Sequence, residues 1–321
     1  MAFMNGASYF VLNMSLTASF AIAAVLLIRL VRPLPRRIVY PLWALAFARL
    51  SLPLAPSSHW SLFNFTGGLV RRLVPMEAIL PGAPPLPGAQ RLMTMNVIGA
   101  AQSYAPLAYK TEALRELFTV GATVWVIVAL AALLAACALY ALTLAELHKA
   151  VPIKENLYRC DMLLSPVLTG VLRPKILLPP GLDPDSPEGQ MVLAHENVHR
   201  RRLDNLWRAM AIAVACVRWF NPLVWVMLKA LFTDMELSCD EVVLRKGAYG
   251  PQQRKAYASA LLRFAEDKRF LISTSFGRAG VKVRIVNVLN YKRMTWIGIA
   301  ASAAFVLAMA LVLLTNPTLR G

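Results

Sequence analysis

The sequence is poor in charged residues, and in acidic residues above all. Only 16% of its 321 residues are charged, and Asp and Glu number 17 against 34 Lys and Arg. Soluble globular domains are about 25% charged and about 45–50% apolar. This chain is 58% hydrophobic, with a mean hydropathy of +0.54. The composition therefore argues against a wholly soluble protein and favours one with membrane spans.

Cysteine is also scarce, with four residues and no Cys-x-x-Cys pair. Cys137 lies in an apolar run and Cys216 in a hydrophobic segment, which argues against a disulfide framework and predicts reduced thiols. No recognisable nucleic-acid-binding module accompanies the net charge of +17, so no direct nucleic acid partner is expected. The basic residues flank the apolar runs, where they mark the cytosolic side and contact membrane lipid.

Four apolar runs approach the length of about 20 residues that crosses a bilayer. They are residues 9–28, 38–55, 117–145 and 294–319. The second is the weakest because it contains Arg49 and Pro53. No positive charge precedes the first run, which argues against a cleavable signal peptide. We predict a mainly α-helical integral membrane protein with four transmembrane helices.

Lys and Arg near the ends of these runs predict the orientation of the chain. They follow the first and third runs and precede the fourth: Arg29, Arg32, Arg36, Arg37, Lys149, Lys154, Arg284, Lys292 and Arg293. These flanks are predicted to lie in the cytosol, with both termini outside the cell membrane. Residues 1–145 then form a membrane region with a proline-rich extracellular loop, 56–116, and residues 146–293 form a cytosolic domain. Within this domain the apolar stretch 209–232 is predicted to form two core helices, because each half is too short to span.

The cytosolic segment contains the pattern His-Glu-x-x-His, beginning at His195. Ser186 as N-cap and Pro187 at the first helical position predict a helix. On that helix His195 and His199 share a face and can bind one zinc ion. Glu196 lies next to the metal, where it can take a proton from water. The alternative is a polar helix face that holds two histidines by coincidence.

A catalytic zinc ion needs a third protein ligand, and Glu236 is the candidate. Asn221 and Pro222 predict the start of its helix. Asp240, four residues further on, shares the face of Glu236 and is placed to accept the outer N–H of a ligand histidine. Cys239 is the alternative ligand, although its position beside Asp240 predicts that it faces elsewhere. A solvated acidic face is the alternative without a metal.

The stretch His195–Asp204 resembles the zinc motif of the BlaR/MecR-type membrane metallopeptidases, which transduce beta-lactam sensing in bacteria. Residues 165–179, 219–225 and 234–241 are similar to the segments around that motif in the family, in the same order. The resemblance implies a gluzincin-like α+β zinc metallopeptidase domain. It also implies the residue roles: Zn²⁺ ligands His195, His199 and Glu236, general base Glu196, and ligand support from Asp240.

The resemblance further implies signalling by proteolysis on the cytosolic side, with self-cleavage and loss of a transcriptional repressor. A self-cleavage is predicted near Ser275 and Phe276, with an ordinary loop as the alternative. The chain has no Ser-x-x-Lys motif of an acylated penicillin-binding sensor, and only a short tail follows the last run. Covalent binding of a beta-lactam is therefore not expected. Either another domain or protein performs the sensing, or the natural signal is not a beta-lactam.

Two other functions stay open at this point. One is a housekeeping or prenyl-protein-type membrane zinc protease, which shares His-Glu-x-x-His and a downstream Glu. The other is a non-enzymatic signalling scaffold that binds a partner through its basic cytosolic domain. The identity of the substrate distinguishes the housekeeping protease from a signalling protease. A requirement for zinc distinguishes either protease from the non-enzymatic scaffold.

Overall fold

A computed structural model of the chain describes residues 2–31, 34–52, 56, 58–62, 112–264 and 280–315. Helices stand at all four predicted apolar runs: α1 (Ala2–Arg29), α2 (Arg36–Ser51), α6 (Glu112–Glu146) and α13 (Trp296–Leu314). Within the described residues, two helical segments are long and apolar enough to cross a membrane, Thr119–Glu146 and Trp296–Leu314. The described apolar part of α1, Met14–Arg29, is shorter, and α2 has 16 residues. The described residues thus hold two candidate spans, and the count of four remains a prediction.

Most of the predicted extracellular loop, 56–116, lies outside the described residues. The predicted cleavage position at Ser275 and Phe276 lies wholly outside them. The four cysteines are free thiols, as predicted.

A small sheet follows α6 and the short 3-10 turn η3 (Leu147–Lys149). It consists of β1 (Val151–Lys154), β2 (Leu157–Arg159), β3 (Val167–Thr169) and β4 (Lys175–Leu178). The strand order is β1-β2-β4-β3, with β2 and β4 parallel and the other pairs antiparallel. Leu157, Ile176 and Leu178 of this sheet pack with Val192 of the next helix. The sheet therefore fixes the position of that helix, α7.

The predicted capping residues begin the two helices that carry the motif residues. The Ser186 hydroxyl accepts the Gly189 N–H at the start of α7 (Pro187–Arg202), and the Asn221 side chain accepts the Leu223 N–H at the start of α9 (Pro222–Lys246). Between them, Leu203 adopts the left-handed conformation with φ 54°, which ends α7 and allows α8 (Asp204–Val217) to begin at once. Both cap predictions are confirmed.

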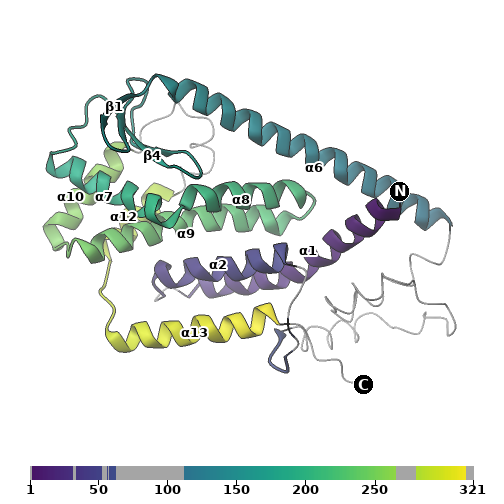
Figure 1. Ribbon diagram of the computed structural model, residues 1–321. Helices are drawn as coiled ribbons and strands as arrows, with labels where there is room; N and C mark the ends of the chain where they lie inside the picture. Colours follow the sequence, from purple (N-terminus) through teal and green to yellow (C-terminus); the bar gives the residue numbers. More distant parts are fainter. Residues whose placement is uncertain are drawn as a thin grey trace.

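The α8–α9 hairpin packs among the apolar helices and not in a separate domain core. Its residues share one hydrophobic cluster with those of α1, α2 and α13, including Ala18, Ile22, Leu42, Ala211, Ala215, Val224, Met227, Leu228 and Leu313. Figure 1 shows α13, then α1 and α2, then α8 and α9 in successive layers, with α6 slanting across the far side. The stretch 209–232 thus belongs to two helices, and both share an apolar cluster with α1 and α2.

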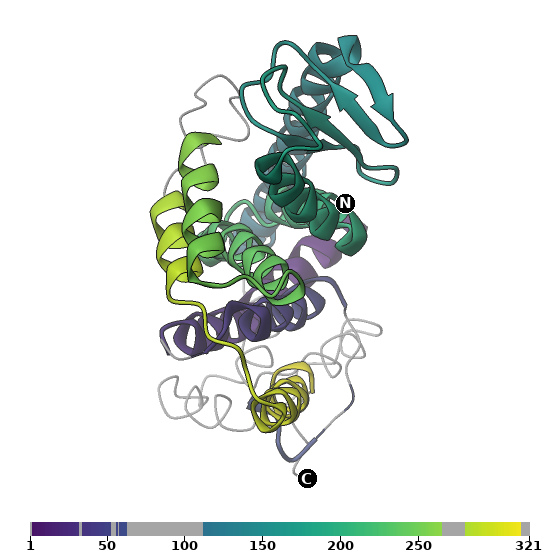
Figure 2. The same ribbon diagram turned by 90° about the vertical axis from the view of Figure 1, so that its left-hand side faces the viewer.

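The C-terminal half of α9 leaves this cluster and meets two further helices, α10 (Pro251–Arg263) and α12 (Gly280–Leu289). Cys239, Val243, Tyr257 and Val288 form the shared core there, together with Val198 of α7. Figure 2 shows α10 and α12 on one side of α7 and α9, with the sheet above them. The motif residues of α7 and α9 thus lie between the sheet, the apolar helices and the α10–α12 pair.

Candidate metal centre

His195 and His199 face each other one turn apart on α7. Their Nε2 atoms are 3.0 Å apart, and both side chains are buried. This closeness follows from the four-residue spacing, which puts both side chains on one face of the helix. The two Nε2 atoms are therefore placed to bind the same metal ion.

Glu236 of α9 brings a carboxylate to the same point. Its Oε2 lies 3.4 Å from His195 Nε2, and its Oε1 lies 3.6 Å from His199 Nε2. Two ligand atoms at about 2.0–2.1 Å from one tetrahedral zinc ion are about 3.3 Å apart. The three separations, 3.0, 3.4 and 3.6 Å, lie around that value. This donor set has the spacing that a single zinc ion needs.

Cys239 also belongs to this cluster, so the prediction that it faces elsewhere is wrong. Ligand atoms of His195, His199 and Cys239 lie within 4.8 Å of one another. The reason is helical spacing, because Cys239 is three residues after Glu236 and positions three apart share a face. The Cys239 thiol donates to the backbone carbonyl of His195 over 3.4 Å. Two alternative ligand sets therefore exist, one with Glu236 and one with Cys239.

Each histidine has a buried carboxylate behind its outer nitrogen. Asp240 Oδ1 lies 3.2 Å from His195 Nδ1, where sequence reasoning had placed it. Asp204 Oδ2 lies 2.5 Å from His199 Nδ1, a contact that sequence reasoning missed. The sequence feature that could have indicated this contact is the position of Asp204, directly after the turn that ends α7. Carboxylates at both Nδ1 atoms assign the ring protons to Nδ1, so both Nε2 lone pairs face the shared site.

Two arginines that the sequence did not single out hold the acids of the centre. Arg284 of α12 binds Asp240 with Nε and Nη2, both at 2.9 Å. It also contacts Glu236 Oε2 through Nη1 at 3.1 Å, and Arg208 of α8 binds Glu236 Oε1. Arg284 Nη2 lies only 3.3 Å from His195 Nε2. Positive charge therefore borders the site directly.

These arginines keep the carboxyl groups ionised. Burial alone would raise the pKa of Asp240, but the Arg284 guanidinium lowers that pKa to about 2. Burial also opposes ionisation of Glu236, while the Arg284 guanidinium helps to hold the pKa of Glu236 well below its usual range. Both side chains are therefore anionic at neutral pH, as cation ligands and their supports must be.

The tyrosines and the arginine of the neighbouring helix α10 region do not face the Nε2 side of the two histidines. The Tyr257 hydroxyl lies behind His195, 2.9 Å from Nδ1, and donates to Asp240 Oδ1 over 2.7 Å. Tyr249 packs edge-on against Tyr257, and Arg254 donates to the Tyr291 carbonyl. The groups that do border the site are the guanidinium groups of Arg208 and Arg284.

Glu196 is half-buried on α7. Within the part of the chain that the structure describes, no hydrogen bond or ion pair engages its carboxylate, in contrast to Glu236 and Asp240. An unengaged carboxylate next to His195 is free to accept a proton from a water molecule. The position fits the general base that the motif predicts.

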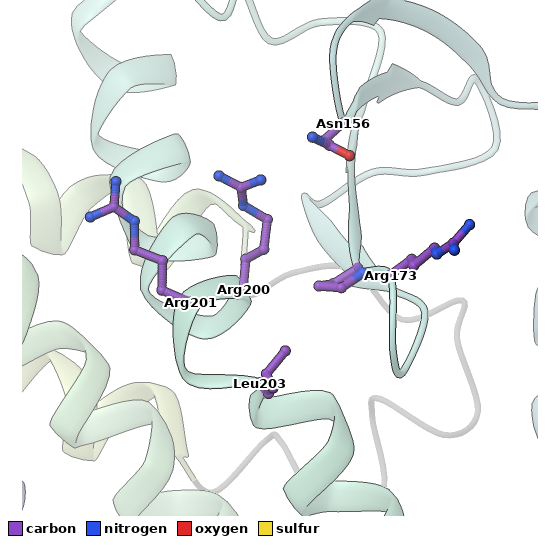
Figure 3. A pocket seen from close by; sticks show the side chains of 6 residues that line it. Asn156, Arg173, Arg200, Arg201 and Leu203 are labelled. Carbon is purple, nitrogen blue, oxygen red and sulfur yellow. The ribbon is translucent and has the colours of Figure 1, made fainter.

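A separate basic pocket lies beyond the C-terminal end of α7. It is lined by Asn156, Arg173, Pro174, Arg200, Arg201 and Leu203. Figure 3 shows the side chains of Arg200 and Arg201 extending from the end of α7, while Arg173 points away from them. The Arg200 Nε donates to the Asn197 side chain. None of the residues lining this pocket belongs to the metal-ligand candidates.

Buried histidines, ionised carboxylates and a half-buried glutamate, set on helices that join an apolar bundle, define a centre of the metallopeptidase class. Residues 9–279 match the family model described as BlaR1 peptidase M56, and the chain belongs to this family. The protein described as "Regulatory protein BlaR1" of Bacillus licheniformis is 34% identical over 173 residues. That match covers 51% of this chain and 28% of the relative, so the two share only a part of the relative's length. Membership places the chain among the M56 metallopeptidases and implies a bound metal.

Proposed function

We propose that this chain is a zinc metallopeptidase that transmits a signal across the cell membrane by hydrolysing peptide bonds on the cytosolic side. The convergence of His195, His199 and Glu236 within 3.0–3.6 Å is the observation that carries the proposal. These three residues hold Zn²⁺, and Asp240 and Asp204 orient the two imidazoles. Bound zinc supplies a Lewis acid and lowers the pKa of a water molecule.

The chain's own residues supply the proton transfers and the positive charge. Glu196 takes a proton from the attacking water and returns it to the nitrogen of the leaving amine. Arg208 and Arg284 fix the Glu236 carboxylate and place positive charge where negative charge develops on the scissile carbonyl oxygen. The substrate is a cytosolic protein. A transcriptional repressor and the chain's own segment near Ser275 and Phe276 are the proposed targets.

Metal content and metal removal test this proposal most directly. Purified full-length protein is expected to contain about one zinc ion per chain, by elemental analysis. A chelator should remove both zinc and cleavage activity, and added zinc should restore both. His195→Ala should lose the metal, while His59→Ala, at an exposed position outside the motif, should keep it.

The opposite result selects an alternative. A wild-type chain without metal leaves a non-enzymatic scaffold as the function. Zinc-dependent cleavage of damaged membrane proteins or prenylated peptides, with no cleavage of a repressor or of the chain itself, leaves a housekeeping protease.

The proposed topology has residues 146–293 in the cytosol, four spans at 9–28, 38–55, 117–145 and 294–319, and both termini outside. Arg29 and Arg36 support it, because they stand at the facing ends of α1 and α2 and both contact Asp234 of α9. The metal centre then lies at the level of the cytosolic ends of these helices.

Reporter fusions test the topology. A phosphatase that is active only outside the cytosol should be active when it is joined after Thr315 and inactive when it is joined after Phe264. A green fluorescent protein at the same two positions should give the reverse pattern and serves as the control. Phosphatase activity at both positions would contradict the proposed cytosolic location of the catalytic residues.

A further inference from the structure

Helix α2 is bonded to α9 on both sides of the metal-centre acids. The Glu241 carboxylate accepts the backbone N–H groups of Arg36 at 2.9 Å and Arg37 at 3.1 Å, the first of α2. Asp234 accepts the Trp43 indole N–H at 2.9 Å and the Arg29 side chain at 3.0 Å. Asp234 and Glu241 are buried. The N-terminal half of α2 is therefore held against α9 by hydrogen bonds whose acceptor carboxylates are buried from water.

A further hydrogen bond leads from α2 toward a ligand histidine. The Tyr40 hydroxyl donates to Asp204 Oδ1 over 3.2 Å, and Asp204 Oδ2 is the atom 2.5 Å from His199 Nδ1. Asp204 is fully buried. One carboxylate therefore joins an apolar helix near the N-terminus to the metal centre.

Arg202 completes the arrangement around this carboxylate. It donates to both Asp204 oxygens, at 3.1 Å and 2.8 Å, and its guanidinium group lies 4.5 Å from the centre of the Tyr40 ring. The ring of Tyr40 therefore supports Arg202, while its hydroxyl contacts Asp204 directly. Phe at position 40 would keep the ring and remove only the hydroxyl.

The other ligand histidine is supported from a different part of the chain. The outer nitrogen of His195 meets Asp240 and Tyr257, and Asp240 is held by Arg284. These residues lie on α9, α10 and α12. Within the described residues, the Tyr40 bond to Asp204 is thus the contact from α2 that reaches a carboxylate bound to a ligand histidine.

We propose that Tyr40 is a positioning residue for His199, and that the position of α2 sets the zinc affinity of the centre through the Tyr40–Asp204–His199 contacts. The inference rests on the proposed zinc site. A displacement of α2 relative to α8 breaks the bond from Tyr40, because Asp204 is the first residue of α8. Asp204 then loses one of its partners and holds His199 less firmly. A signal that moves the membrane helices reaches the metal by this route.

Zinc affinity of the full-length chain in lipid nanodiscs tests the proposal. Tyr40→Phe is expected to weaken zinc binding by about 10-fold in competition with a chelator, since groups behind metal ligands contribute about 10–100-fold. Tyr158→Phe is the matched control, because it removes the same hydroxyl group from a half-buried tyrosine of β2 that lies outside the metal centre. It should bind zinc as the wild type does. The thermal midpoint of each metal-free variant shows whether folding is intact.

A double substitution separates positioning from general packing. If Tyr40 acts through Asp204, Tyr40→Phe should weaken zinc binding no further in an Asp204→Asn background. Equal losses in Tyr40→Phe and Tyr158→Phe, or additive losses in the double variant, would overturn the positioning role. Zinc binding by Tyr40→Phe as tight as that of the wild type would do the same. A wild type that binds no zinc would instead overturn the proposed function on which the inference rests.

Discussion

Glu196→Gln is expected to abolish peptide cleavage while the protein keeps its zinc. The amide has the shape of the carboxylate but cannot take a proton from water, and a general base contributes about 10²–10⁴-fold to a rate. Glu196 is not among the groups that lie within reach of both Nε2 atoms, so the metal ligands are unchanged. The measurement is the rate at which the 35.4 kDa chain breaks into fragments, with elemental analysis of zinc on the same samples. Mass spectrometry of the fragments checks the predicted position near Ser275 and Phe276.

Glu188→Gln is the control for this experiment. Glu188 lies on the same helix, where it pairs with Arg263 at the surface, so its loss should leave both zinc and cleavage intact. Cleavage by Glu196→Gln at the wild-type rate would show that another group is the base. Loss of zinc in Glu196→Gln would show that Glu196 is a ligand.

Glu236→Gln is expected to weaken zinc binding by about 100-fold, and Cys239→Ser by no more than a few fold. Structural zinc sites bind with about 10 kcal/mol or more, so one of three ligands accounts for about 3 kcal/mol, which is about 100-fold. Glu236 is near both Nε2 atoms, whereas the Cys239 thiol donates to a backbone carbonyl. The geometry therefore favours the carboxylate as the third ligand.

Cobalt substitution gives a second and independent readout of the same question. A thiolate bound to Co²⁺ produces an intense near-ultraviolet charge-transfer band, and a carboxylate does not. The wild type should lack this band. A band that is present in the wild type and absent in Cys239→Ser would make Cys239 the ligand and would assign Glu236 to binding Arg208 and Arg284.

The parts of the site that the sequence predicted are those fixed by local spacing. Two histidines four apart, a serine before a proline, and an asparagine before a proline each specify a short helical geometry whatever the rest of the fold does. Glu236 and Asp240 were found by the same periodicity. Cys239 follows the same rule. Its three-residue spacing from Glu236 puts it on the face of the metal-ligand candidates, although it is adjacent to Asp240.

The residues that the sequence did not predict reach the site across long separations. Arg284 is 89 positions from His195, and Tyr40 is 164 positions from Asp204. An arginine near the start of a span resembles any other basic flank in the sequence, and a tyrosine in an apolar helix resembles an interfacial residue. Their roles depend on how α2 and α12 pack against α8 and α9, which no local pattern specifies.

The hydropathy of the chain likewise predicted helices but not their neighbours. The apolar stretch 209–232 is compatible with a soluble core and with a place among membrane helices, since both environments are apolar. The contacts of Asn221 show which helix this stretch packs against, because its side chain donates to Ser15 and Ser19 of α1. Such a partner is invisible until the helices are assembled.

The support of His195 by Arg284 has a consequence for the order in which the enzyme is made. The ribosome synthesises α1, α2, α7 and α9 long before α12, and the His-Glu-x-x-His stretch emerges while the guanidinium group that holds Asp240 does not yet exist. The nascent chain therefore carries the zinc-binding residues without their complete support. In the proposed mechanism, competence to cleave is therefore acquired only after α12 has been made.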